Sequence, residues 1–224
     1  MKKLFAVLLT VTMMACMFAS CDKKDKSGSS AKTDVITENA NGLKCDSKLT
    51  GGWTGEELQG GVLYFSKDNK LSQKVDYTKL QGWTFDESAK MLKVEGEGGG
   101  EFPYTYDGTN FEVEEYGLHL VREGSADEST INGTYGPTEE EKAMMGGIEI
   151  YFIINDGNAV MEMVLGEYSA DGKMCKFFGK SSVVFGSFAE NEDEGTEAEY
   201  TIDGDTLTIK NPEGGSDLVL DRAK

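Results

Sequence analysis

The sequence is poor in histidine, proline and positive charge. Its 224 residues include 1 His, 3 Pro and 22 Lys+Arg against 40 Asp+Glu, which gives a formal net charge of -18. Binding to a nucleic-acid backbone requires clustered cations, and no basic stripe is present, so we expect no nucleic-acid partner. The single histidine, His119, lies between Leu118 and Leu120. If these leucines face a core, His119 faces solvent.

Motifs for catalysis and metal binding are also missing from the sequence. No Gly-x-Ser-x-Gly or comparable nucleophile motif is present, and no Cys/His set has zinc spacing. The acidic segment 190–195 lacks the alternating ligands of a calcium loop and is more typical of a solvated hairpin tip. We therefore expect no metal, no cofactor and no enzyme activity.

Long apolar runs are absent except at the N-terminus. Residues 4–19 are too few for a stable transmembrane helix, follow Lys2 and Lys3, and lead into small residues. This order is typical of a secretory signal peptide, which we place at 1–20. Beyond it, a hydrophobic content of 38% is enough to build a core.

The segment Phe18-Ala19-Ser20-Cys21 resembles the lipobox of bacterial lipoproteins, with Phe18 in place of the usual leucine. The resemblance implies that Cys21 is acylated and that its acyl chains anchor the protein to a membrane, for which we favour the outer membrane. Loss of Lys2 and Lys3 with the signal peptide takes the formal charge from -18 to -20, so anionic headgroups would repel the polypeptide. Residues 21–47, rich in Lys, Asp and Ser, then form a flexible tether.

Two cysteines remain after these assignments, since Cys16 leaves with the signal peptide and Cys21 carries lipid. Cys45 and Cys175 form an even pair in an oxidising compartment. A disulfide and two buried free thiols fit this pair about equally well.

The sequence contains an internal repeat. Laying one half over the other gives four similar blocks in the same order. They pair residues 51–57 with 133–141, 60–65 with 146–152, 104–111 with 200–207, and 118–122 with 218–222. We therefore predict a tandem duplication, with repeat 1 at 48–124 and repeat 2 at 130–224.

Each repeat alternates apolar and polar residues with period two, which indicates β-strands. Asp-Gly dipeptides, typical of tight hairpin turns, separate these strands. Thr54 with Glu57, and Thr138 with Glu141, have the spacing of helix capping boxes. The sequence therefore predicts an all-β fold of two tandem antiparallel up-and-down meander barrels or curved sheets, each with a short helical turn between its first and second strands.

The repeats resemble small lipocalin-like domains through Gly51-Gly52-Trp53 on a first strand and Arg122 on a last strand. In lipocalins such a tryptophan packs under an arginine of the final strand and closes the barrel. The resemblance implies that Trp53 meets Arg122, and that Tyr135 meets Arg222 in repeat 2. It covers about residues 48–223.

The lipocalin-like resemblance implies ligand binding in the interior as one possible function. We expect a non-catalytic envelope binding module for a small apolar or amphipathic molecule, and a pocket would support this function. The alternative is a structural or interaction lipoprotein, whose filled barrels present an acidic surface to an envelope or extracellular protein or glycan. The candidate ligand-lining residues are Tyr64, Trp83, Tyr104, Met161, Met163 and Phe177.

Overall fold

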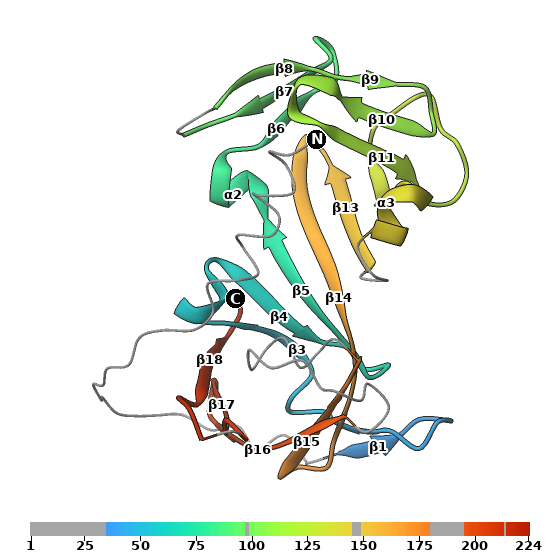
Figure 1. Ribbon diagram of the computed structural model, residues 1–224. Helices are drawn as coiled ribbons and strands as arrows, with labels where there is room; N and C mark the ends of the chain where they lie inside the picture. The colour runs from blue at the N-terminus through green and yellow to red at the C-terminus, as the bar shows by residue number, and fades with distance from the viewer. Residues whose placement is uncertain (1–34, 97–98, 145–148, 180–194, 213) are drawn as a thin grey trace. The chain divides into compact units, whose positions relative to one another are not determined.

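The structure, a computed structural model, describes residues 35–96, 99–144, 149–179, 195–212 and 214–224 (Figure 1). Antiparallel strands dominate this part of the chain, which confirms the prediction of an all-β antiparallel fold. The signal peptide and Cys21 lie outside the described residues. Among the helices of the described residues, none has the length and apolar character needed to cross a membrane.

The chain divides into two compact units, and neither coincides with a predicted repeat. One unit is Lys74–Met163, which we call the Tyr135 unit. The other combines the described residues of Met13–Gln73 with Val164–Lys224, and we call it the Trp53 barrel. Each unit therefore takes strands from both repeats, and the predicted boundaries 48–124 and 130–224 do not separate the units.

The Trp53 barrel is a closed ring of eight antiparallel strands, because β14 pairs with β15 at the ends of the order β15-β16-β17-β18-β3-β4-β5-β14. At the joint between repeats, Arg222 on the last strand lies opposite Trp53 on the first. Repeat 1 contributes β3 (Gly51–Thr54), η1 (Glu56–Leu58), β4 (Gly61–Phe65) and the start of β5 (Lys70–Asp76); repeat 2 contributes the end of β14 (Asn158–Ala170), β15 (Met174–Phe178), β16 (Thr196–Asp203), β17 (Thr206–Ile209) and β18 (Leu218–Arg222).

The Tyr135 unit combines the complementary parts. Its main sheet runs β14-β13-β12-β11-β10-β9, and β6-β7-β8 form a separate sheet. At its joint between repeats, Arg122 lies opposite Tyr135. Repeat 1 contributes the end of β5, α2 (Tyr77–Gln81), β6 (Thr84–Asp86), β7 (Met91–Val94), β8 (Gly100–Pro103), β9 (Thr105–Tyr106), β10 (Asn110–Val113), η2 (Glu114–Tyr116) and β11 (Leu118–Arg122); repeat 2 contributes β12 (Gly133–Pro137), α3 (Glu139–Met144), β13 (Glu149–Asn155) and the start of β14.

The long strand β14 explains why the units mix the repeats. It is 13 residues long, which corresponds to about 40 Å of extended chain, roughly twice the usual strand. Its first part belongs to the Tyr135 unit and its second part to the Trp53 barrel. The buried side chains change parity at Gly166, which has a φ of 128°, as expected where a strand bulges. The shorter β5 likewise passes from one unit into the other.

The local turn signals are confirmed. Asp107-Gly108, Asp156-Gly157, Asp171-Gly172 and Asp203-Gly204 each connect consecutive strands. The glycines of these pairs have positive φ, which favours residues without a Cβ. These turns make the antiparallel meander that the sequence predicts.

The helical signals are confirmed in position and only partly in mechanism. At α3 the amide of Glu141 donates to Thr138 Oγ1 (3.3 Å), and the amide of Thr138 donates back to Glu141 Oε2 (2.9 Å), a complete capping box. The turn after Thr54 is the 3-10 helix η1, and its N-cap, Gly55, makes no side-chain cap bond. Sequence reasoning missed α2, although Asp76 caps it by accepting from the amide of Lys79.

Part of the predicted tether at 21–47 is folded. Within 21–47, β1 (Ile36–Glu38) and β2 (Lys44–Asp46) form an antiparallel hairpin. The backbone of Lys44 joins this hairpin to the Trp53 barrel: its amide donates to Ser169 Oγ (2.9 Å), and its carbonyl accepts from Asn69 Nδ2 (2.9 Å). These residues are part of the folded protein because the barrel supplies their hydrogen-bond partners.

Candidate functional site

Arg222 clamps the segment that leads into the first strand of the Trp53 barrel. Its Cζ lies 4.1 Å from the centroid of the buried Trp53 ring, within cation-π range. Its Nη2 donates to the carbonyl of Lys48 (2.6 Å) and its Nη1 to that of Thr50 (3.1 Å). Between them, the Leu49 carbonyl accepts from Trp53 Nε1 (2.7 Å). Three consecutive carbonyls are thus held by one arginine and one indole.

Arg122 makes the equivalent clamp in the Tyr135 unit. Its Nη1 donates to the carbonyl of Thr130 (3.2 Å) and its Nη2 to that of Asn132 (2.7 Å). The Ile131 carbonyl accepts from the Tyr135 hydroxyl (2.6 Å). Here the Arg122 Cζ lies farther from the ring, at 5.8 Å, and its Nη1 donates to the Tyr135 hydroxyl (3.2 Å). Residues 130–135 therefore repeat the contacts of residues 48–53.

A glycine lies beside the arginine in both clamps. A Cβ at Gly51 would lie 3.3 Å from Arg222 Nη1, and one at Gly133 would lie 3.0 Å from Arg122 Cζ. Both distances are shorter than ordinary van der Waals contact. A small residue at this position gives the guanidinium room to reach the carbonyls.

The predicted partners of the two aromatic residues are wrong. Trp53 meets Arg222 instead of Arg122, and Tyr135 meets Arg122 instead of Arg222. The exchange follows from β5 and β14, which carry the chain out of one unit and into the other. As the resemblance implied, each aromatic residue of a first strand contacts an arginine of a last strand. The arginine, however, belongs to the other repeat.

The six candidate ligand-lining residues are divided between the two units. Tyr64 and Phe177 belong to the Trp53 barrel, and the other four belong to the Tyr135 unit. Tyr64 is 39% exposed, whereas the other five are buried. These five are Trp83, Tyr104, Met161, Met163 and Phe177.

Aromatic side chains fill the interior of the Tyr135 unit around Trp83, Tyr104 and Met161. Trp83 stacks on Phe152 with ring centroids 6.3 Å apart, and it meets Tyr77 at 4.8 Å. The Tyr77 hydroxyl contacts the sulfur of Met161 at 3.9 Å. Burial raises the pKa of Tyr104 to about 12, with help from the nearby carboxylates of Glu87 and Asp86. These residues act as core.

The two remaining cysteines are buried free thiols. Cys45 Sγ lies 3.4 Å from the hydroxyl of Tyr168, which donates to the Ser66 carbonyl (2.6 Å). Burial raises the pKa of the Cys175 thiol well above its usual range, so it stays protonated and unreactive. The disulfide alternative is therefore not realised in the structure.

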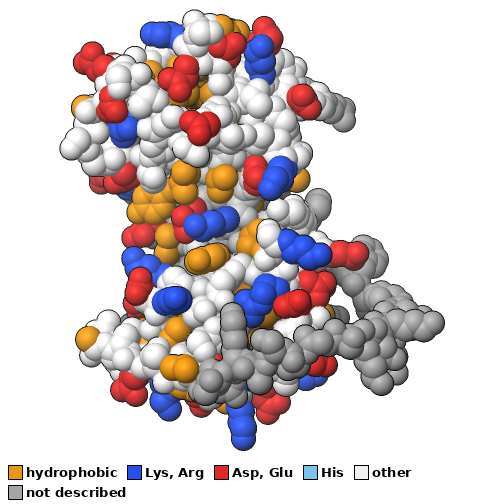
Figure 2. Space-filling view, turned by 180° about the vertical axis from the view of Figure 1, so that it is seen from behind, with side chains coloured by type: hydrophobic (Ala, Val, Ile, Leu, Met, Phe, Trp, Pro, Cys, Tyr) orange, Lys and Arg blue, Asp and Glu red, His pale blue; other side chains and the backbone are white. Residues whose placement is uncertain are grey.

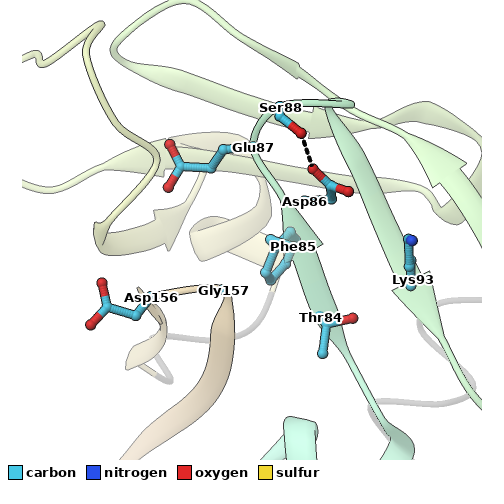
Figure 3. Close-up of a pocket in the computed structure, with 8 residues that line it drawn as sticks. All are labelled: Thr84, Phe85, Asp86, Glu87, Ser88, Lys93, Asp156 and Gly157. Atoms are coloured by element: carbon cyan, nitrogen blue, oxygen red, sulfur yellow. Dashed lines mark hydrogen bonds between the residues drawn. The ribbon is translucent and has the colours of Figure 1, made fainter.

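A hollow of about 490 Å³ opens on the Tyr135 unit (Figure 3). Its lining is mostly polar, and none of the six candidate ligand-lining residues contributes to it. Asp86 Oδ1 is already engaged by Ser88 Oγ (2.7 Å) and by the amide of Ala89 (3.0 Å). The lining residues are Thr84, Phe85, Asp86, Glu87, Ser88, Lys93, Asp156 and Gly157.

His119 and the acidic segment 190–195 are the remaining candidates. The His119 side chain is 45% exposed, as expected for the outward face of β11, and its Nδ1 lies 4.0 Å from Glu112 Oε1. Within the part of the chain that the structure describes, no group of His, Cys, Asp and Glu is arranged to hold a metal ion. Residues 190–194 of the acidic segment lie outside that part.

Comparison with known protein families, with curated proteins and with solved structures finds no match for this chain. The lipobox and lipocalin-like resemblances therefore rest on the residues that carry them.

Proposed function

We propose that this chain is a lipid-anchored, non-catalytic protein of the cell envelope that works through the outer surface of its two packed, lipocalin-like units. The observation that carries this proposal is the burial of Trp83, Tyr104, Met161, Met163 and Phe177, which is what packing in a filled core requires. Apolar ligands bind in concave apolar sites, whereas the hollow of Figure 3 is polar. The interaction function, which was the alternative, is therefore the one that the geometry supports best.

The charge of the surface favours a basic or hydrophilic partner. On the face seen in Figure 2, Asp and Glu side chains are spread over the surface among lysines and arginines. With a formal charge of -18 for the whole chain, association with a basic protein would be steered by electrostatics and weakened by salt. Exposed apolar side chains, including Tyr64 and Val219, add contact area on the Trp53 barrel.

The ligand question is tested by native mass spectrometry of the full-length processed protein extracted from membranes in a mild detergent. We expect the mass of the acylated polypeptide with no stoichiometric small molecule. Titration with a fluorescent fatty acid should likewise show no saturable binding. A bound small molecule at one per chain, or saturable uptake of the fatty acid that Phe177→Trp abolishes, would overturn the proposal and favour an apolar-ligand binding module.

The anchor is tested separately at Cys21. Because no other segment is expected to hold the protein at the membrane, Cys21→Ala should move it from the membrane fraction to the soluble envelope fraction. Cys16→Ala is the matched control and should leave it in the membrane fraction. Retention of the Cys21→Ala protein after a salt wash would contradict the lipid anchor. Fractionation of inner and outer membranes tests the outer-membrane location.

A further inference from the structure

Each unit contains a joint where a last strand of one repeat meets a first strand of the other repeat. In the Tyr135 unit this joint is β11 against β12, and residues 123–132 connect the two strands directly. In the Trp53 barrel it is β18 against β3, which are the last and the first strands of the barrel in sequence order. In the first joint a short loop connects the two strands, whereas in the second the two strands are far apart in the sequence.

The two joints have the same clamp in spite of this difference. Arg122 reaches carbonyls 8 and 10 residues away in the sequence. Arg222 reaches carbonyls 172 and 174 residues away. Both arginines lie over an aromatic ring, and both rings donate to the carbonyl of the residue four positions earlier. The joint therefore forms without a peptide connection between the strands that it joins.

We propose that this chain can form a dimer with a second copy of itself, in which the two copies exchange whole repeats. In such a dimer, repeat 1 of one copy and repeat 2 of the other build one Tyr135 unit and one Trp53 barrel, and the reciprocal pair builds the second set. All contacts within the units are the same as in the monomer, so the dimer differs mainly in the conformation of the connection between the repeats. This inference does not depend on the proposed function.

The connection supplies a suitable hinge. Gly124, Ser125 and Ala126 are exposed, and Gly124 has a φ of 87°. On either side, Arg122 is held by the Thr130 carbonyl, and the carbonyl of Asp127 accepts from the Tyr106 hydroxyl (2.6 Å). Opening of the connection is therefore confined to about three residues. Exchange also requires both units to open, so it should occur during folding and be slow between folded copies.

The test uses two copies of the mature chain, without residues 1–20 and with Cys21→Ala. The two copies carry different affinity tags. They are unfolded together in urea and refolded at high protein concentration, and mixed species are selected through both tags. We expect a mixed dimer of twice the monomer mass that persists after dilution and is absent when folded copies are mixed. Exclusively monomeric protein after refolding at every concentration would overturn the proposal.

The hinge gives a sharper test. Deletion of 124–126 should raise the dimer fraction at least tenfold, because a short connection disfavours the intramolecular β11–β12 joint. Insertion of six Gly/Ser residues between Ser125 and Ala126 should lower it, and the same insertion in the exposed turn at 88–89 is the matched control without effect. A deletion variant that is folded and monomeric would contradict the exchange.

A nicked protein keeps the test decisive if the deletion variant does not fold. A protease site placed between Ser125 and Ala126 is cleaved in the folded full chain. The two fragments should stay associated in native buffer, and after unfolding they should recombine with differently tagged fragments. Fragments that separate in native buffer, each with β-type circular dichroism, would show that each repeat folds alone and would overturn the proposal.

Discussion

The Trp53 barrel and the Tyr135 unit use one clamp in two settings. The barrel is a closed ring of eight strands, whereas the Tyr135 unit keeps β6-β7-β8 as a separate sheet. The Arg222 side chain is 33% exposed and lies 4.1 Å from its ring centroid. The Arg122 side chain is 12% exposed and 5.8 Å from its ring, and it gains hydroxyl contacts instead.

The two clamps share their hydrogen bonds to the backbone and differ in the contact between the guanidinium and the ring. Both versions keep the bonds from the arginine to two carbonyls and the bond from the aromatic residue to the carbonyl between them. The cation-π distance and the nature of the ring differ. The hydrogen bonds that hold the three carbonyls before the first strand are therefore the same in both clamps. The stacking of the guanidinium on the aromatic ring differs between them.

Trp53→Ala should have the largest effect, and it should fall on the barrel. Removal of a fully buried large side chain costs about 3–5 kcal/mol, and the Leu49 carbonyl also loses its donor. Urea unfolding followed by circular dichroism measures this cost, and Trp83 remains as a fluorescent reporter in the Tyr135 unit. Trp53→Phe, which keeps an aromatic ring, is the milder control. A loss below about 1.5 kcal/mol would mean that Trp53 does not hold the barrel together.

Tyr135→Phe should have the next largest effect, because it keeps the ring and removes only the hydroxyl. The buried Ile131 carbonyl loses a 2.6 Å bond, and Arg122 loses an acceptor. An unsatisfied buried polar group costs about 1–3 kcal/mol. Tyr151→Phe, whose hydroxyl lies 3.5 Å from Glu149, is the control and should change the free energy of unfolding by less than about 0.5 kcal/mol. Equal effects of the two variants would contradict the role of the hydroxyl.

Alkaline pH should weaken the Tyr135 unit. The pKa of Tyr104 is raised to about 12 in the folded state, against about 10 for an unfolded tyrosine. Between these values the unfolded chain releases the proton more readily, so the stabilisation is complete below about pH 10 and decreases as the pH rises toward 12. Urea midpoints at pH 8, 10 and 11 measure this decrease, and Tyr104→Phe should make it smaller. An identical decrease in the Tyr104→Phe protein would exclude Tyr104 as a source.

Reduction should have the smallest effect, which we expect to be none. Cys45 and Cys175 are free thiols, so dithiothreitol should leave the urea midpoint unchanged. A disulfide that closed so long a loop would contribute about 4–5 kcal/mol, and its reduction would be obvious. Counting thiols after unfolding without a reductant should give two per chain in the processed Cys21→Ala protein. A count of zero would show that the cysteines are bonded.

The sequence predicted features that depend on neighbouring residues. The Asp-Gly turns, the Thr138–Glu141 capping box and the alternation of the strands all appear where they were expected. The lipocalin-like resemblance, extended to both repeats, also implied that Trp53, Tyr135 and the two arginines take part in closing contacts. Each of these signals is contained in a few consecutive residues or in a comparison of two such segments.

Long-range pairings were not predictable in the same way. Period-two alternation tells which face of a strand is buried, and it does not tell which strand lies beside it. The absence of a turn signal between Asn158 and Ala170 was the available hint that one strand serves two units. The hairpin at 36–46 was missed because one of its stabilising partners, Ser169, is 125 residues away from Lys44.

Sequence patterns also do not distinguish ligand-lining residues from core residues. Met161 and Met163 alternate along β14 in the same way whether they line a cavity or pack in a core. The neighbouring rings, such as Tyr77 and Trp83, distinguish a packed core from a cavity. These rings are far from Met161 in the sequence.

A double-mutant cycle tests most directly whether the units combine strands of both repeats. The cycle compares Trp53→Phe, Arg222→Met and the double variant by urea unfolding, and a parallel cycle replaces Arg222→Met with Arg122→Met. We expect a coupling free energy of roughly 0.5–1 kcal/mol between Trp53 and Arg222, because phenylalanine keeps part of the cation-π contact of the indole, and none within error between Trp53 and Arg122. Coupling of Trp53 to Arg122, with none to Arg222, would show that each repeat closes on itself and would contradict the exchange of strands.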